Sequence, residues 1–266
     1  METGLATQLF LSSRRSIGLS PETIRWYQGI LKFFAQRYET IPGDPSQIEA
    51  FIADCKGKDE RKHGYYRTLR CFYGFLENRY EVTNPMGLVY APKRRRKFPP
   101  TLTPDDLDQL IAYPHPKKVK GALYFLIDTG ARVGEVVGLT IPDLSDTPWG
   151  YTARVRGKTG ERIVPISNET YNILFAILPF GYSKYRLRRL ISMAFRNARV
   201  RGSAHTIRHT FGTLWNGDEL VLQSIMGHAH LSTTKVYRHL RTEKLSEQHR
   251  RFSPLRMLGK RTPNML

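Results

Sequence analysis

This sequence of 266 residues contains only two cysteines, Cys55 and Cys71, and both fall in stretches with helical periodicity. A disulfide-stabilised fold is therefore not expected, and a reducing compartment fits. No stretch approaches the roughly 20 consecutive apolar residues that a membrane-spanning helix needs. The first residues, METGLATQLF, also lack the basic segment and apolar run of a signal peptide. Together these absences predict a cytoplasmic protein.

Acidic residues are also scarce. The chain has 23 Asp and Glu against 42 Lys and Arg, a formal net charge of +19. Hydrophobic residues make up 40%, which is ordinary for a globular protein, and the length allows two domains. A polyanionic partner is the simplest reason to tolerate such self-repulsion. An anionic membrane surface or ribosomal RNA would also explain the charge, so charge alone does not choose among them.

The N-terminal part of the chain, residues 1–91, predicts a small helical domain. Ser20-Pro21-Glu22 forms a helix start, because a capping hydroxyl, a first-turn proline and an acid follow one another. Further helices are expected from about residue 45 and over about 61–79. The last of these has a basic face, which a solvated surface explains as readily as DNA contact, made of Arg61, Lys62, Arg67 and Arg70.

Five consecutive basic residues stand between prolines in the stretch 92–100. Such a run cannot pack as a core helix, so we expect an extended linker between the domains 1–91 and 101–266. A linker this basic can lie along a DNA backbone, although a nuclear-localisation signal is a competing interpretation. Its candidates for DNA contact are Lys93, Arg94, Arg95, Arg96 and Lys97.

Residues 101–266 predict a second domain, again mostly helical. Residues 151–156 alternate as a β-strand does, 157–160 suit a turn, and 162–166 return as a second strand. Helices are expected before this hairpin at about 103–113, 117–128 and 133–139. Others should follow it at about 168–178, 184–199, 205–215, 219–226, 232–239 and 242–251. The predicted fold class is mainly α with a small antiparallel β hairpin.

The stretch 182–201 contains seven basic residues and no acidic ones. This density favours a surface that faces phosphates. The four basic residues at its start are the candidates for DNA contact: Lys184, Arg186, Arg188 and Arg189.

Two arginines are the strongest candidates for holding a phosphodiester. Arg132 and Arg208 each lie at or just after a predicted helix start, beside apolar residues rather than in a charge run. A guanidinium can donate two hydrogen bonds to phosphate oxygens and does not deprotonate. His205 precedes Arg208 by three residues, so the two share a helix face. His228 follows a glycine at a predicted helix end; a structural hydrogen bond would also explain it.

Tyr237 and Lys158 complete a possible phosphoryl-transfer site. A phenol has a pKa of about 10, so a phosphotyrosyl ester can form and later yield to a sugar hydroxyl without ATP. Lys158, at the tip of the predicted hairpin, is placed to give a proton to the leaving oxygen. Alone, Tyr237 would more often be a core residue and Lys158 an exposed turn residue.

Together these residues resemble the tyrosine recombinase (phage integrase) family, especially its compact Xer-like members. The resemblance rests on four stretches: TGARVGEVVGL at 129–139, RGKTGERIVPI at 156–166, HTIRHTF at 205–211 and IMGHAHLSTTKVY at 225–237. It implies a helical core-binding domain followed by a catalytic domain. The implied catalytic residues are Arg132, Lys158, His205, Arg208, His228 and the nucleophile Tyr237, with Glu135 supporting Arg132.

The resemblance also implies the reaction and the partners. Tyr237 would attack a scissile phosphate of duplex DNA and leave a 3′-phosphotyrosyl link. Four protomers on two DNA sites, either all of this chain or with a second recombinase among them, would exchange strands through a Holliday junction at the nucleoid. No metal or other cofactor is expected. The segment 243–258 resembles a terminal helix that docks on a neighbouring protomer, through Leu245, Phe252, Leu255 and Leu258.

Three other functions remain open from the sequence. A catalytically silent DNA-binding protein of the same fold would keep the basic surface, and a type IB topoisomerase-like enzyme would use the same chemistry to relax DNA. A zinc hydrolase could use His205 and His209 with His228 or His230. Thr206 stands where a His-Glu-x-x-His motif has glutamate, which disfavours the zinc site.

Overall fold

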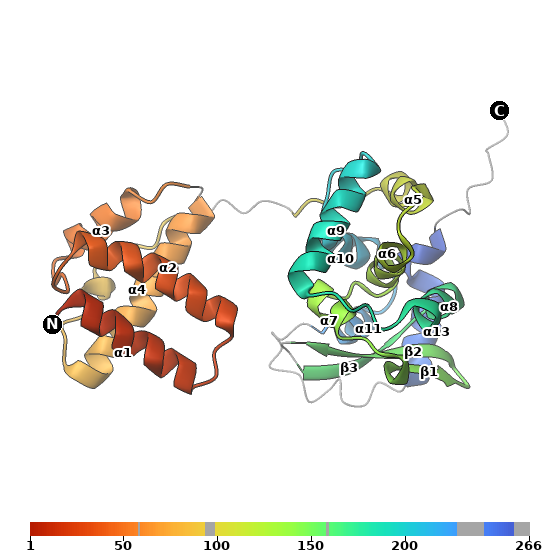
Figure 1. The fold of residues 1–266 in the computed structure, drawn as a ribbon, viewed down its shortest axis with the longest axis horizontal. Coiled ribbons are helices and arrows are strands. Elements are labelled where there is room, and N and C mark those ends of the chain that lie inside the picture. The colour runs from red at the N-terminus through yellow and green to blue at the C-terminus, as the bar shows by residue number, and fades with distance from the viewer. Residues whose placement is uncertain (58, 94–98, 158–159, 228–241, 258–266) are drawn as a thin grey trace. The chain divides into compact units, whose positions relative to one another are not determined.

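In the computed structural model the chain forms two compact units, Met1–Lys97 and Phe98–Leu266 (Figure 1). Their boundary falls within the proline-bracketed basic stretch. The structure describes all residues except 58, 94–98, 158–159, 228–241 and 258–266. Each unit has its own hydrophobic core. No helix in the described part of the chain is both long and apolar enough to cross a membrane.

The first unit consists of helices α1 (Thr3–Ser16), α2 (Pro21–Arg37), α3 (Pro45–Ala53) and α4 (Asp59–Tyr80), and the 3-10 turn η1 (Pro85–Gly87). The Ser20 hydroxyl accepts a hydrogen bond from the Thr23 amide, so the predicted start of α2 is confirmed. Helices α3 and α4 are confirmed as well. Helix α1 is not among the predicted helices, because its N-cap residue Glu2 makes no side-chain capping bond.

Aromatic side chains hold α1 in the first unit. Phe10 of α1, Phe34 of α2 and Phe72 of α4 are fully buried. The Phe10 and Phe72 rings meet edge to face with 5.5 Å between their centroids, and Phe34 and Phe72 do so at 6.4 Å. Tertiary packing, rather than a local start signal, therefore stabilises this helix.

The second unit is mostly helical around a small sheet. Before and within the sheet lie α5 (Pro104–Ala112), α6 (Lys117–Thr129), α7 (Val133–Val137), η2 (Ile141–Asp143), β1 (Leu144–Thr147), β2 (Gly150–Gly157) and β3 (Gly160–Pro165). After it lie α8 (Asn168–Ile177), α9 (Lys184–Asn197), α10 (Ala204–Leu214), α11 (Glu219–Met226), α13 (Thr242–Phe252) and η3 (Pro254–Met257). The predicted helix at 232–239 falls outside the described residues.

The three strands pair antiparallel in the order β1-β2-β3. The β2–β3 hairpin is the predicted one, and its register places Val155 opposite Arg162 and Gly157 opposite Gly160. Strand β1 was not predicted, because its sequence LSDT has no apolar alternation. The fold class, mainly α with a small antiparallel sheet, is confirmed.

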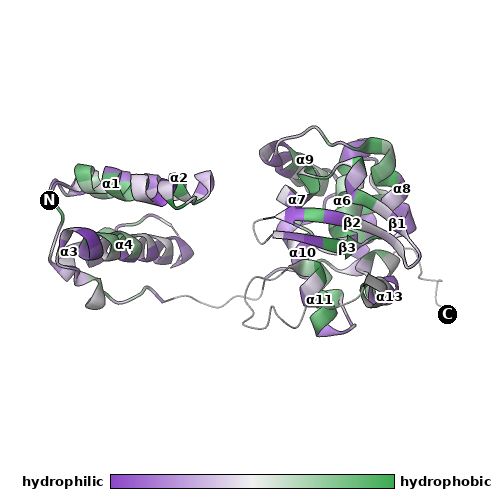
Figure 2. Cartoon of the chain, turned by 90° about the horizontal axis from the view of Figure 1, so that it is seen from below, coloured by the Kyte–Doolittle hydropathy of each residue, from purple (hydrophilic) through white to green (hydrophobic). Residues whose placement is uncertain are grey.

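Helix α6 lies in the middle of the second unit. Nearly every residue from Val119 to Thr129 is buried, and the helix packs against α8, α9 and α10. Figure 2 accordingly shows α6 mostly in the colour of hydrophobic residues. A helix that is apolar on all sides is expected in a core. Because α6 packs against several helices, the positions of the residues that directly follow it, Gly130 to Arg132, are well determined by that packing.

Helix α13 packs on its own unit. Leu245 and Leu255 are buried in the same core as α6, and the Phe252 ring lies 6.1 Å from the ring of Trp215. In this structure of one chain, the core of the same unit takes up Leu245 and Leu255. Leu258 lies outside the described residues, and docking of this segment on a neighbour stays a prediction.

A buried polar network fastens α13 to the end of α6. His249 Nε2 lies 2.7 Å from the Asp128 carbonyl oxygen and 3.0 Å from its carboxylate Oδ1. The Ser253 hydroxyl donates to the same Oδ1 at 2.7 Å, and the Ser167 amide donates to Oδ2 at 2.7 Å. Burial raises the pKa of Asp128, but the charge and hydrogen bond of His249 outweigh it and hold that pKa below its usual value.

We predict that Asp128→Asn lowers the free energy of unfolding by about 3 kcal/mol, because it removes the charge from a fully buried pair and replaces one acceptor oxygen by an N–H donor. Glu247→Gln on α13 is the matched control, since its ion pair with Arg251 is exposed; it should change stability by less than about 0.5 kcal/mol. Urea unfolding of both variants measures this. Equal, small effects would show that the buried network does not hold α13.

Candidate active site

A cleft of about 720 Å³ opens on the second unit. Four elements that are distant in sequence contribute to it: the start of α7, the end of β2, helix α9 and the start of α10. Its polar and charged lining residues are Arg132, Glu135, Arg156, Lys184, Arg188, Ser192, Ser203, His205 and Arg208. The structure thus brings together four of the seven residues predicted to form the catalytic set and its support: Arg132, Glu135, His205 and Arg208.

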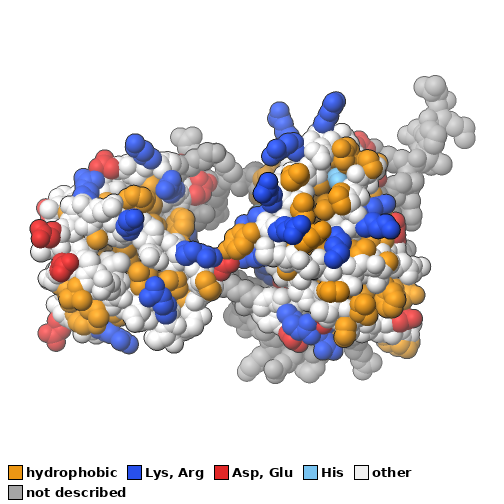
Figure 3. Space-filling view, viewed as in Figure 1, with side chains coloured by type: hydrophobic (Ala, Val, Ile, Leu, Met, Phe, Trp, Pro, Cys, Tyr) orange, Lys and Arg blue, Asp and Glu red, His pale blue; other side chains and the backbone are white. Residues whose placement is uncertain are grey.

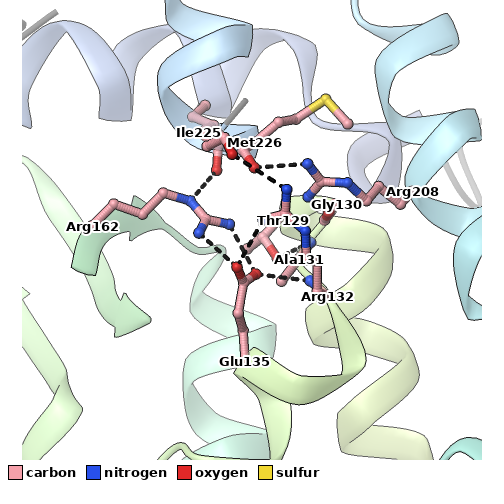
Figure 4. A network of polar contacts seen from close by, with 10 residues as sticks. Thr129, Gly130, Ala131, Arg132, Glu135, Arg162, Arg208, Ile225 and Met226 are labelled. Atoms are coloured by element: carbon pink, nitrogen blue, oxygen red, sulfur yellow. Dashed lines mark hydrogen bonds and ion pairs between the residues drawn. The ribbon is translucent and has the colours of Figure 1, made fainter. Parts of the chain in front are cut away.

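Arg208 is fixed by the ends of two helices. Its side chain projects from α10 and is only 6% exposed. Nη1 donates to the Gly130 carbonyl at 2.7 Å, just past the end of α6, and Nη2 donates to the Met226 carbonyl of α11 at 2.8 Å (Figure 4). Burial, followed by repulsion from Arg132 and Arg162, lowers the pKa of Arg208 to about 10. The guanidinium is therefore still a cation at neutral pH.

Arg132 stands at the N-cap of α7 with its side chain 37% exposed. Nη1 donates to Glu135 Oε1 at 3.1 Å, and Nη2 donates to the Gly227 carbonyl at 3.3 Å. The left-handed Gly227 ends α11 as Gly130 ends α6. Each of the two arginines is thus aligned by a helix end and still has N–H groups for a ligand in the cleft.

Glu135 is the carboxylate at the centre of this arginine cluster, 1% exposed. Its Oε2 accepts from the Arg132 backbone amide at 2.8 Å, and both oxygens accept from Arg162, at 2.8 and 2.9 Å. Burial raises the pKa of Glu135, but Arg162 and then Arg132 outweigh it and lower the pKa to about 2. The carboxylate is ionised at any physiological pH.

His205 lies in the first turn of α10 and lines the cleft. Burial, then the charges of His209, Arg208 and Arg132, lower the pKa of His205 below its usual value. The imidazole is therefore neutral at physiological pH, so it can accept a proton.

The pair of histidines considered for zinc is close together, with the His205 and His209 rings 4.3 Å apart. Within the described ranges, no three His, Cys, Asp or Glu side chains form a group suited to a metal. His228 and His230, which would complete the zinc site, lie outside those ranges. Lys158 and Tyr237 lie outside them too.

Helix α9 gives the cleft its basic wall. Its residues Lys184, Arg188 and Ser192 recur every four positions and all line the cleft. Arg186 instead lies over the Tyr182 ring, 4.7 Å from its centroid, and Arg189 is exposed. Figure 3 shows several Lys and Arg side chains and few acidic ones over the region of α9. Two of the four predicted DNA contacts on this helix therefore face the cleft.

The predicted DNA contacts of the first unit differ in exposure. Arg61, Arg67 and Arg70 are exposed on α4. Lys62 is half-buried and donates to the Ala53 carbonyl at 2.9 Å, so it also stabilises the end of α3. Lys93 is exposed, and the remaining linker candidates, Arg94 to Lys97, lie outside the described residues.

Arg156 and Arg162 belong to the site although neither was proposed as a site residue. Arg156 lines the cleft and pairs with Asp143 at 2.7 Å. Arg162 does not line the cleft itself but forms an ion pair with Glu135, which does. A signal for Arg162 exists in the sequence: it alternates with the buried Val164, so the strand pattern places a charge on the inner face.

The comparisons with known proteins point to one family. A profile of the Phage integrase family matches residues 100–244. The tyrosine recombinase XerC of Pelobacter propionicus is 31% identical over 96% of this chain and 96% of its own length. The tyrosine recombinase XerD of Listeria monocytogenes is 27% identical over 89% and 94%. The structure of a lambda integrase tetramer bound to a Holliday junction superposes with a TM-score of 0.68 at 17% identity, covering 86% of this chain and 77% of that one.

We predict that Glu135 makes stability pH-dependent in acid. Its pKa is lower in the folded chain, about 2, than in the unfolded chain, so the unfolded chain takes up the proton first as pH falls. Its contribution is complete above about pH 4.5 and is lost as pH falls toward 2. Between pH 4.5 and 3, wild type should lose roughly 1.4 kcal/mol per pH unit more than Glu135→Gln.

Urea unfolding at a series of pH values from 6 to 3 measures this difference, because the other carboxylates titrate in both proteins. Parallel curves for wild type and Glu135→Gln would contradict an ionised, strongly paired Glu135.

Proposed function

Since this chain belongs to the phage integrase family, we propose that it acts as a site-specific tyrosine recombinase that cuts and rejoins duplex DNA. The observation that carries the assignment of the site is the cleft that holds Arg132, His205 and Arg208 together. Arg132 precedes α7, His205 and Arg208 share α10, and all three line this one cleft. The chain is an enzyme of the DNA strand transferase class.

We assign the two cleft arginines to the scissile phosphate. Negative charge builds on the phosphate oxygens as a nucleophile adds, and preorganised cations stabilise that charge most effectively where water is partly excluded. Arg208 is held rigidly by two carbonyls, and Arg132 by a carbonyl and a carboxylate. Neither side chain has to reorganise when the phosphate arrives.

The proposed chemical step uses the three residues that lie outside the described ranges together with His205. The Tyr237 oxygen forms a bond to phosphorus, the bond to the 5′ oxygen breaks, and Lys158 gives that oxygen a proton. The phenol proton passes to a neutral imidazole, for which His205 is suited by its lowered pKa. His228 donates a hydrogen bond to the phosphate. The product is a 3′-phosphotyrosyl link and a free 5′ hydroxyl; the reverse reaction rejoins DNA.

We further propose that the active assembly is an oligomer on DNA. The integrase whose fold this chain shares forms a tetramer on a Holliday junction, and two DNA sites with two strands each need four nucleophiles. The four protomers are either identical copies of this chain or include a second recombinase.

The two-unit division proposed for the chain is a core-binding domain at 1–91, a linker at 92–100 and a catalytic domain at 101–266. We place its action in the cytoplasm, at the nucleoid.

The nucleophile can be tested with a nicked duplex taken from DNA that flanks the gene, in which cleavage releases a short fragment and traps the product. We expect wild type to form a protein–DNA adduct that survives denaturant. Tyr237→Phe should abolish the adduct, because it removes the attacking oxygen. Tyr185→Phe, at an exposed tyrosine of α9, is the matched control and should retain it.

An adduct that persists in Tyr237→Phe would show that another residue is the nucleophile. Salt-sensitive binding of the same DNA without any adduct would instead favour a DNA-binding protein that does not cut.

The basic wall of the cleft predicts a change in salt dependence. If Lys184 and Arg188 each contact a phosphate, their joint replacement by alanine should lower the slope of log K against log salt by about 2 in magnitude. The control removes two exposed cations of the same unit outside the cleft, Lys120 and Arg154, and should leave the slope within about 0.5 of wild type. Filter binding from 50 to 300 mM salt, roughly, measures both. An equal drop in both variants would show that only net charge matters.

A further inference from the structure

In strand β3 an apolar side chain is exposed and a neighbouring charged side chain is buried, the reverse of the usual arrangement. Ile163 points outward and is 45% exposed, whereas the Arg162 side chain points inward and is only 12% exposed. Arg162 does not line the cleft, so it cannot bind DNA there in this arrangement. An inward arginine costs desolvation unless its hydrogen bonds are satisfied, so its partners show what it does.

Those partners belong to α7, whose N-cap is Arg132, and to the end of α11. Nη1 and Nη2 donate to the two oxygens of Glu135, and Nε donates to the Ile225 carbonyl at 2.7 Å (Figure 4). The next two carbonyls of that chain segment, Met226 and Gly227, accept from Arg208 and Arg132. Three consecutive carbonyls are thus held by three different arginines.

Two glycines lie against the Glu135–Arg162 pair, where a larger residue would crowd it. A Cβ at Gly157 would stand 2.5 Å from Glu135 Oε1, and a Cβ at Gly227 would stand 3.0 Å from Arg162 Nε. Gly157 directly precedes Lys158, and Gly227 directly precedes His228. The last described residue before each of these two proposed catalytic residues therefore lies against this one ion pair.

The same pair affects the charge available to a phosphate. Glu135 alone would neutralise Arg132, the cleft arginine that it contacts. With Arg162 as its second partner, the carboxylate is shared by two cations, and the group of three keeps a formal charge of +1. Arg162 therefore offsets the electrostatic cost of having Glu135 beside a phosphate-binding residue.

We propose that Arg162 is a positioning residue for strand cleavage. Through its ion pair with Glu135 and its bond to Ile225 it fixes the end of α11 relative to Arg132, and it keeps the charge of Arg132 available to the phosphate. This inference rests on the proposed function.

The test compares Arg162→Met, which keeps the size but not the charge, with Arg162→Lys, which keeps the charge but not the fork geometry. Arg154→Met is the matched control, since Arg154 lies exposed on the adjacent strand β2. For each variant the rate of adduct formation at saturating nicked DNA, the affinity for that DNA and the thermal unfolding are measured. A role in positioning acts on the cleavage rate and leaves the affinity alone.

We expect Arg162→Met to slow cleavage about 100-fold and Arg162→Lys about 10-fold, with DNA affinity within about threefold of wild type in both. Arg154→Met should cleave like wild type. The double variant Arg162→Met, Glu135→Gln should cleave faster than Arg162→Met alone, because it also removes the uncompensated carboxylate. If Arg162→Met does not fold, the cleavage rates of Arg162→Lys and of the double variant are compared with that of wild type instead.

Cleavage at the wild-type rate in the folded Arg162 variants would overturn the inference, as would a loss explained wholly by weaker DNA binding. If wild type itself gives no Tyr237-dependent adduct, the proposed function fails before any variant is compared, so the two failures are distinguishable.

Discussion

The hydrogen bonds from arginine side chains to helix-terminal carbonyls are the interaction on which this site depends. Helices α6 and α11 both end at a left-handed glycine, where the last carbonyls have no amide partner within the helix. Arg208 bridges the two ends, and Arg132 and Arg162 hold the carbonyls on either side of Met226. The partial negative charge of a helix C-terminus favours these cations. Backbone geometry, more than side-chain acids, therefore determines where the arginines lie.

This arrangement explains how a strongly cationic cleft can be stable before any anion binds. Arg132 and Arg162 hold one carboxylate, and burial followed by repulsion from these two cations lowers the pKa of Arg208. Carbonyl dipoles stabilise the cations without cancelling their charge, whereas additional carboxylates would form neutral pairs. The cleft thus keeps a positive field and a fixed arrangement of cations, which suits the phosphate proposed to bind there. The single acid, Glu135, is shared by two arginines, which limits its effect on either.

Most of the fold could be predicted because its local signals agree with its tertiary structure. The Ser20-Pro21-Glu22 start and the alternating strand at 151–156 specify their elements without help from distant residues. Helix α1 and strand β1 could not be predicted, since the first is held by Phe10 in an aromatic core and the second only by pairing with β2. The position of α13 was likewise beyond the sequence, because nothing local distinguishes Leu245 docked on its own unit from Leu245 docked on a neighbour. Arg162 was overlooked for a different reason: a charged residue in a strand is ordinarily assigned to the solvent face.

The residues 128–132, between α6 and α7, connect these features. Asp128 holds α13 through His249 and Ser253, Gly130 accepts from Arg208, and Arg132 reaches the carbonyl of Gly227. The segment 228–241, which contains His228 and Tyr237, begins directly after Gly227 and ends directly before α13. The described residues on either side of it, Gly227 and α13, are therefore both fastened to the same five residues, one of which is the proposed phosphate ligand. The burial of α6 in the core thus fixes the position of Arg132 and Gly227 at the proposed phosphate site as well as the position of α13, so the same packing contributes to the geometry of the cleft and to stability.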